Sequence, residues 1–341
     1  MPIQISKDFN LKKFNTFGVA ATAAECVRIK DEEQLQEVRE ILQERTDGSF
    51  LVLGGGSDIL FTKDFPGLVI LMENKGIAEE GEDDRHYFVR ASAGENWHAF
   101  VRRMVLEGKY GLENLALIPG TVGGAPIQNI GAYGLEVGQR IESVRCFDLE
   151  TGNFVDLTHD DCQFGYRTSV FKAEESKRYI ITSVLFRLHK VWEPVLTYKE
   201  LKREIENNRP PILKVEDVFA SVISLRIRKL PDPQKIGNAG SFFKNPTMTK
   251  AEFMPILRDN PDVVFYPIDE DNVKISAAWL IDAAGLKGLR MGNCGTYDRQ
   301  PLVIVNYGQA NGEEIYEMAQ SIRTHVKNSF GIRLKPEVVI V

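Results

Sequence analysis

The chain has 341 residues, of which 43% are hydrophobic and 26% are charged. This length and composition exclude a disordered or fibrous protein and predict two or three folded units with buried cores. The formal net charge of -6 excludes a long-range attraction to nucleic acid or to an anionic membrane, so an anionic ligand must meet a local cluster of Lys and Arg. We therefore expect no nucleic-acid or membrane partner.

The four cysteines are scattered along the chain, without a CxxC pair or a Cys/His ligand spacing. That spacing argues against a disulfide framework and a zinc site, so we expect reduced, mostly buried thiols and no metal. The first residues lack the basic and apolar regions of a signal peptide, and no apolar run reaches membrane-spanning length. A cytoplasmic protein is expected.

Strands and amphipathic helices alternate in the first half of the chain. Apolar residues recur at helical spacing from Leu35 to Leu42, and the apolar run 51–53 then predicts a strand that enters a glycine turn. Further along the chain, apolar runs predict strands at 68–71, from Tyr87 and from Ile180. Apolar residues at helical spacing predict a helix from Trp97 ending at Gly108, and two strand-like runs around a turn predict a hairpin at 144–157.

Proline-bearing and charged stretches at 190–217 mark the expected boundary with a second unit. In that unit the sequence predicts helices at 218–223, 276–284 and 313–327, a strand at 302–306, and a last strand in the closing VVIV.

Two glycine-rich segments favour a ligand with a diphosphate. The segment LGGGSDIL at 53–60 follows a strand, and its glycines allow backbone N–H groups to converge on an anion. It is not a Rossmann fingerprint, because Ile59 occupies the third glycine position. The second segment, 117–134, has more glycine than a simple connection needs and predicts a ligand groove lined by backbone. A pair of irregular structural loops is the alternative.

Ser241 is the first candidate for chemistry. It lies in NAGSFFKNP, between a glycine and two aromatic residues, and the turn LPDPQ with Lys229 and Lys235 precedes it. Cations and a rigid turn before a hydroxyl suit a charged substrate, and Arg226 and Arg228 extend the cluster. The alternative is a turn-capping serine followed by two core phenylalanines.

Ten segments occur in one order along the chain: FNTFG from Phe14, GGGSD from Gly54, AGENWHAFV from Ala93, GLENLALIPGTVGGAPIQNIGAYG from Gly111, CQFGYRTSVFK from Cys162, PVLTYKEL from Pro194, KLPDP from Lys229, NAGSFFKNP from Asn238, AAWLID from Ala277 and KPEV from Lys335. Together they resemble the UDP-N-acetylenolpyruvoylglucosamine reductases, flavoenzymes that make UDP-N-acetylmuramate for the bacterial cell wall. The resemblance implies an α+β protein, in which a two-subdomain FAD-binding fold of the vanillyl-alcohol-oxidase (PCMH) type is joined to a C-terminal α+β substrate-binding domain.

The resemblance also implies a domain plan and a cofactor. The FAD-binding domain would span 1–190, with subdomains at about 1–70 and 71–190, followed by a substrate loop and connection at 191–225 and the substrate domain at 226–341. FAD would be non-covalent, because Ser57 stands where relatives with attached flavin often carry histidine. Asp58 departs from the more frequent asparagine and adds a negative charge beside the expected diphosphate. The expected cofactor residues are Leu53, Gly54, Gly55, Gly56, Ser57, Asp58, Ile118, Pro119, Gly120, Thr121, Gly123, Gly124, Ile127, Gln128, Asn129, Gly131, Ala132 and Tyr133.

Three residues carry the chemistry by resemblance. Arg167 would stabilise the substrate carboxylate, Glu337 would hydrogen-bond it in its protonated form, and Ser241 would protonate the carbon beside it. NADPH would donate the hydride to FAD, and the substrate would be UDP-N-acetylglucosamine enolpyruvate. Tyr198 resembles the tyrosine of a subgroup whose mobile loop closes over substrate. The expected nucleotide-diphosphate contacts are Tyr198, Lys229, Asn245 and Gln300.

Taken alone, each of these residues has an ordinary structural interpretation. Arg167 could form a surface ion pair, Glu337 could be a solvated residue before an edge strand, and Tyr198 could be an aromatic residue that covers the core. Two other functions stay open at the level of sequence. One is a different FAD-dependent oxidoreductase of the same fold, and the other is a catalytically silent protein that binds a nucleotide sugar. A monomer is expected.

Overall fold

The computed structural model describes residues 3–45, 49–208 and 210–341. The chain divides into two compact units and passes between them several times, and one passage lies inside the first glycine segment, between Gly55 and Gly56. In the described ranges, no helix combines the length and the apolar character that a membrane crossing requires. Unit 1 holds Met1–Phe9, Ala23–Gly55 and Pro66–Arg228, and unit 2 holds Asn10–Thr22, Gly56–Phe65 and Lys229–Val341.

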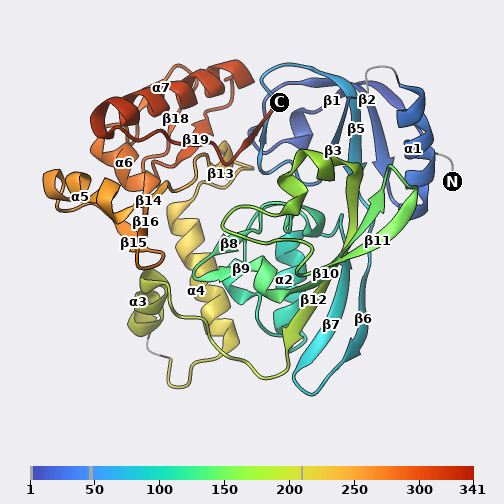
Figure 1. Cartoon of the computed structure of the whole chain (residues 1–341), viewed down its shortest axis with the longest axis horizontal. Helices are drawn as coiled ribbons and strands as arrows, with labels where there is room; N and C mark the ends of the chain where they lie inside the picture. The colour runs from blue at the N-terminus through green and yellow to red at the C-terminus, as the bar shows by residue number, and fades with distance from the viewer. Residues whose placement is uncertain (1–2, 46–48, 209) are drawn as a thin grey trace. The chain divides into compact units, whose positions relative to one another are not determined.

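Unit 1 contains two main sheets (Figure 1). The first has the order β1 (Ser6–Asn10), β2 (Thr22–Ile29), β5 (Phe65–Met72) and β3 (Phe50–Leu53). Strands β3 and β5 are parallel. The first glycine segment follows β3 in the chain and therefore leaves its carboxyl end. The second sheet is antiparallel, with the order β11 (Asn153–Thr158), β10 (Ile141–Asp148), β12 (Tyr179–His189), β7 (His86–Ser92) and β6 (Ile77–Glu82).

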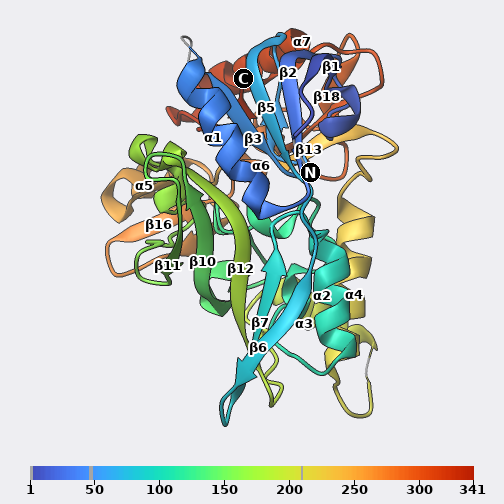
Figure 2. The same ribbon diagram turned by 90° about the vertical axis from the view of Figure 1, so that its right-hand side faces the viewer.

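The helices of unit 1 bury apolar faces against these sheets. Trp97 and Phe100 on α2 contact Phe186 of β12, with ring centroids 6.0 and 4.8 Å apart. Helices α2 and α4 lie side by side in both views (Figures 1 and 2). Their bounds, with those of the other helices in this unit, are α1 (Leu35–Glu44), α2 (Trp97–Leu106), α3 (Lys199–Asn208) and α4 (Val215–Lys229).

Helix α4 corrects the sequence interpretation. We predicted a short helix at 218–223 in the second unit, but the helix has 15 residues. The buried residues Val218, Val222 and Leu225 pack in the same core cluster as α2, so α4 belongs to unit 1 up to Arg228. Their spacing of three and four residues is that of a helix face.

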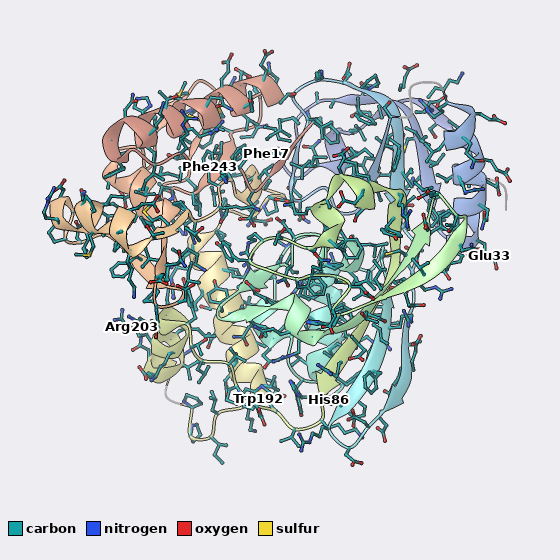
Figure 3. The ribbon with its side chains drawn as sticks, in the orientation of Figure 1. Phe17, Glu33, His86, Trp192, Arg203 and Phe243 are labelled. Carbon is teal, nitrogen blue, oxygen red and sulfur yellow. The ribbon has the colours of Figure 1, made fainter. Side chains whose placement is uncertain are left out.

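Unit 2 is built from short strands and three helices. Its aromatic core includes Phe17, Phe242 and Phe243, with ring centroids of successive pairs 6.3 and 5.1 Å apart. Figure 3 labels Phe17 and Phe243. The sheets are β13 (Gly237–Ser241), β19 (Val303–Asn306), β18 (Cys294–Thr296) and β17 (Arg290–Met291); β14 (Thr247–Thr249), β16 (Asn272–Ile275) and β15 (Phe265–Pro267); and the parallel pair β4 (Ile59–Leu60) and β20 (Val339–Ile340). The helices are α5 (Lys250–Asp259), α6 (Ala277–Ala283) and α7 (Gly312–Phe330).

The cysteine prediction is confirmed. All four are free and buried. Burial raises the pKa of Cys26 and of Cys294 to about 11, which keeps both thiols protonated near neutral pH.

Replacing Gly312 by alanine is expected to destabilise unit 2. Gly312 begins α7 and is buried, and a Cβ there would stand 1.7 Å from the carbonyl oxygen of Phe61. Helix propensity favours alanine by about 1 kcal/mol, but a clash with backbone has no rotamer that relieves it, so we expect a net loss of about 1–3 kcal/mol. Urea unfolding measures it. The exposed neighbour variant Glu313→Ala is the control, and equal midpoints for the two would contradict the expectation.

Candidate active site

The two glycine segments meet within unit 1. An added Cβ at Gly54 would lie 2.4 Å from Thr121 Oγ1, and one at Gly55 would lie 2.7 Å from the Cα of Gly120. Only glycine permits this approach of one backbone to another. A cavity of about 620 Å³ adjoins the meeting point and is lined by Gly54 and Thr121 and by two lysines among others. Its lining residues are Lys30, Gly54, Met72, Glu73, Lys75, Gly94 and Thr121.

The start of the second glycine segment is fixed by two side chains. The Leu117 N–H donates to His98 Nδ1 at 3.0 Å, and Arg226 Nε donates to the Leu117 carbonyl at 3.2 Å. Burial, with Arg102 and Arg226 nearby, lowers the pKa of His98, so the ring is neutral and Nδ1 can accept the proton. Leu117 has φ +59, a conformation that these two bonds help to hold.

Arg167 lies against the second glycine segment. Its Nη2 donates to the carbonyl of Gly131 at 2.8 Å. The residue sits in a tight turn closed by Gly165 and Thr168, and its φ of +53 is unusual for a side chain other than glycine. Such strain is common at functional sites. The structure therefore brings the predicted catalytic arginine to a predicted cofactor residue.

Asn129 holds this turn in place. Its Nδ2 donates to the carbonyl of Gly165 at 3.1 Å and to Glu136 Oε2 at 2.9 Å, and its Oδ1 accepts from the Gly138 N–H. The side chain is buried. These bonds give the Asn129 side chain a structural role beside Arg167, and its contact with a cofactor stays a prediction. This structural role could not be predicted from the sequence, because Gly165 is remote along the chain.

In unit 2, a β-bulge presents Ser241. The register of β13 against β19 shifts between Asn238 and Ser241, and Gly240 has φ +67. The Asn238 Oδ1 accepts from the Gly240 N–H at 3.0 Å and stabilises the bulge. Bulges re-aim side chains beside active sites. Phe242 is buried in the core, whereas Ser241 beside it is only half-buried. The segment therefore contributes to the core and also presents an accessible serine.

Glu337 lies on the backbone segment next to Ser241. The Glu337 N–H donates to the carbonyl of Phe242 at 2.8 Å. Two residues on, the Val339 N–H donates to the carbonyl of Asp58 at 3.0 Å, where β20 pairs with β4. Unit 2 thus places Ser241, Glu337 and the end of the first glycine segment on neighbouring backbone segments.

The predicted nucleotide contacts divide between the units. Tyr198 belongs to unit 1, and Asn245, Gln300 and Lys229, the last residue of α4, belong to unit 2. The Asn245 Oδ1 accepts from the Ala277 N–H at 2.9 Å, which orients its amide group. The Gln300 Oε1 is buried and has no hydrogen-bond partner among the described residues. A buried acceptor in this state favours a ligand donor.

The cation cluster predicted around Lys229 is smaller than expected. Arg228 forms an ion pair with Glu204 of α3 at 2.8 Å, and Arg226 bonds to Leu117, so neither is presented as an anion-binding group. Sequence reasoning missed two other lysines, Lys30 and Lys75, which line the cavity beside Gly54.

The other predicted cofactor residues follow the two glycine segments. Leu53 ends β3 and is buried, whereas Ile127 is exposed. Gly123 and Gly124 lie in a 3-10 turn, and Gly131 and Ala132 form β8. Contact of these residues with a cofactor stays a prediction. The same holds for Gly56, Ser57, Ile118, Pro119, Gln128 and Tyr133.

Comparison with known proteins defines the class. Residues 23–158 match the family model described as FAD binding domain. A solvent-stable cholesterol oxidase has the same fold, with a TM-score of 0.52, 11% identity and coverage of 98% of this chain and 87% of that chain. The expected α+β FAD-binding fold is confirmed, and the chain belongs to the class of FAD-dependent oxidoreductases.

The family is also shown. Residues 232–341 match the C-terminal domain of UDP-N-acetylenolpyruvoylglucosamine reductase. The enzyme of that name from Paraburkholderia xenovorans (strain LB400) is 47% identical over 97% of this chain and 96% of its own length. The crystal structure of the UDP-N-acetylenolpyruvylglucosamine reductase from Thermus caldophilus has a TM-score of 0.69 and 25% identity, over 100% of this chain and 99% of that chain. The chain belongs to the UDP-N-acetylenolpyruvoylglucosamine reductase family.

Proposed function

We propose that the protein reduces UDP-N-acetylglucosamine enolpyruvate to UDP-N-acetylmuramate, with NADPH as hydride donor and non-covalent FAD. The observation that carries the proposal is the adjacency of Ser241, Glu337 and Asp58 on neighbouring backbone segments of unit 2. An acid, a hydroxyl and the end of a backbone-lined ligand loop are the parts that such a reduction needs at one place.

The residues around the cavity fit FAD. Gly54 and Thr121 would border the diphosphate, where backbone without side chains leaves room for phosphate oxygens. Lys30 and Lys75 line this cavity together with Glu73, and the two lysines would supply positive charge to the diphosphate. When bound, FAD would take hydride from NADPH and deliver it to the terminal vinyl carbon of the substrate.

Residues of the chain would stabilise the negative charge that builds on the substrate carboxylate and would supply the proton. Electrons displaced from the vinyl group move toward the carboxylate, and the Arg167 guanidinium would stabilise them with paired donors. Glu337, in its protonated form, would donate a further hydrogen bond to the carboxylate. Ser241 would then give a proton to the carbon beside the carboxylate, which completes the addition of hydride and proton across the double bond.

The uridine diphosphate part would be held mainly from unit 2. Lys229 would pair with phosphate, and the Asn245 amide would donate to phosphate or uracil. The buried Gln300 Oε1 would accept from a uracil N–H. Tyr198 would cover the substrate from its loop at 194–201.

One spectroscopic titration tests the proposed function. The purified protein is expected to be yellow, to lose its flavin absorbance with NADPH, and to regain it when the enolpyruvyl nucleotide sugar is added without oxygen. Recovery only on admitting oxygen would indicate a different flavin oxidoreductase. Protein purified without any bound flavin would favour a silent binding protein.

Replacing Tyr198 by alanine is expected to raise the KM for the enolpyruvyl sugar by about tenfold or more, since an interface tyrosine that covers a ligand is worth about 1–2 kcal/mol. FAD retention should fall far less, because Tyr198 itself lies outside both glycine segments and contacts the second of them through the ring of Tyr133. Steady-state kinetics and a flavin release assay measure the two effects. Equal loss of substrate and flavin binding would instead mark Tyr198 as a folding residue.

A further inference from the structure

Asn114 joins two segments that are distant in the sequence. Its Nδ2 donates to the carbonyl of Tyr133 at 2.8 Å and to the carbonyl of Val195 at 2.9 Å. The side chain is fully buried. Both protons of one amide are thus given to two carbonyls, an arrangement that no acidic or aliphatic side chain can reproduce.

The two segments also contact each other directly. The rings of Tyr133 and Tyr198 meet edge-on, with centroids 5.3 Å apart and planes at 86°. Gly134 has φ +90, and a Cβ there would lie 2.3 Å from Thr197 Oγ1. The end of the second glycine segment and the Tyr198 loop are therefore so closely packed at Gly134 that a side chain there would clash with Thr197.

The turn that carries Asn114 holds the loop at a second point. Glu113 is buried, and its Oε1 accepts from Trp192 Nε1 at 2.8 Å, while its Oε2 accepts from the Gly111 N–H (Figure 3 labels Trp192). On the far side of the loop, Leu201 is fully buried. Tyr198 therefore lies on a short span between an anchor at Val195 and an anchor at Leu201.

We propose that Asn114 is a positioning residue for the reaction, a latch that fixes the Tyr198 loop against the end of the second glycine segment. Because one amide serves both carbonyls, displacement of either segment weakens the hold on the other. Order in the cofactor segment and order in the Tyr198 loop are thereby coupled. The consequence for substrate rests on the proposed function, which assigns Tyr198 to the nucleotide sugar.

The first test is Asn114→Asp in the full chain with FAD bound. Aspartate has the same shape but replaces both donors with an acceptor facing two carbonyls. Amide hydrogen exchange in the peptide 196–201 should become about tenfold faster or more. The KM for the enolpyruvyl sugar should rise about tenfold, with kcat changed less and FAD retained.

Asn306→Asp is the matched control. The Asn306 Nδ2 also donates to two carbonyls, those of Phe17 at 3.0 Å and Ala310 at 3.2 Å, but in unit 2. It should lower global stability and leave exchange at 196–201 as in the parent protein. If both variants accelerate that exchange equally, Asn114 is a stabilising core residue and the latch is overturned.

A second set of variants decides the matter if Asn114→Asp does not fold. Gly134→Ala adds backbone strain at φ +90 and a clash with Thr197, and Thr197→Ala added to it removes the clash alone, because the next neighbour of the new Cβ is at 3.5 Å. The double variant should therefore show slower exchange at 196–201 and a lower KM than Gly134→Ala. Failure of this rescue overturns the latch. Faster exchange with an unchanged KM upholds the latch and contradicts the role of Tyr198 in substrate binding.

Discussion

A Ser241→Ala variant is expected to keep FAD and to be reduced by NADPH at the parent rate, yet to lose about 10²- to 10⁴-fold in the half-reaction with substrate. Hydride donation by NADPH needs no proton from the protein, whereas addition across the vinyl group does. The bulge at Asn238–Gly240 sets the direction of the serine side chain, and this backbone stays the same when the hydroxyl is removed. The loss should therefore fall on one step.

Stopped-flow absorbance separates the two half-reactions, with NADPH mixed first and the enolpyruvyl sugar second. Ser321→Ala on α7 is a matched control, because it removes a hydroxyl from the same unit without touching β13. Comparable return of the flavin absorbance in Ser241→Ala and the parent protein would remove Ser241 from its proposed role. Loss of FAD from the variant would point to a structural serine instead.

Local periodicity predicted the longer elements of the fold. The helices at Leu35–Glu44 and Trp97–Leu106 and the strand Tyr179–His189 carry strong apolar patterns, and the structure confirms them. Helix α3 was missed because only Leu201 and Ile205 are buried in an otherwise charged segment. The strands β14, β15 and β16 have three or four residues each, too few for an alternating pattern to be recognised.

The candidate site was predictable only in part. Glycine-rich composition indicated two ligand-binding loops, but it did not predict the close contact between them at Gly55 and Gly120. The pairing of Glu337 with the segment after Ser241 could not be derived from spacing, because almost a hundred residues separate them and the hydrogen bond is between backbone atoms. Only family resemblance pointed to it. Asn114 was missed for the same physical reason.

Replacing Arg167 by lysine is expected to slow the substrate half-reaction by about 10²-fold or more, although the positive charge is kept. A guanidinium presents parallel donors in a fixed plane, and an ammonium on a flexible stem does not. Arg167 also donates to Gly131, so its head group is oriented by the second glycine segment before any substrate arrives. A lysine at this position would lack both this orientation and the paired donors of the guanidinium.

Comparing Arg167→Lys with the parent protein isolates the effect of the charged group, because the backbone strain at position 167 is the same in both proteins. Arginine and lysine have similar strain at the φ of +53 that this turn imposes. Arg103→Lys on α2, where the arginine forms an exposed pair with Glu107, controls for the chemical change in the same unit. Rates are read as the return of flavin absorbance with saturating enolpyruvyl sugar. A parent-like rate in Arg167→Lys would mean that charge alone stabilises the carboxylate, and that the bond to Gly131 serves the fold of the turn.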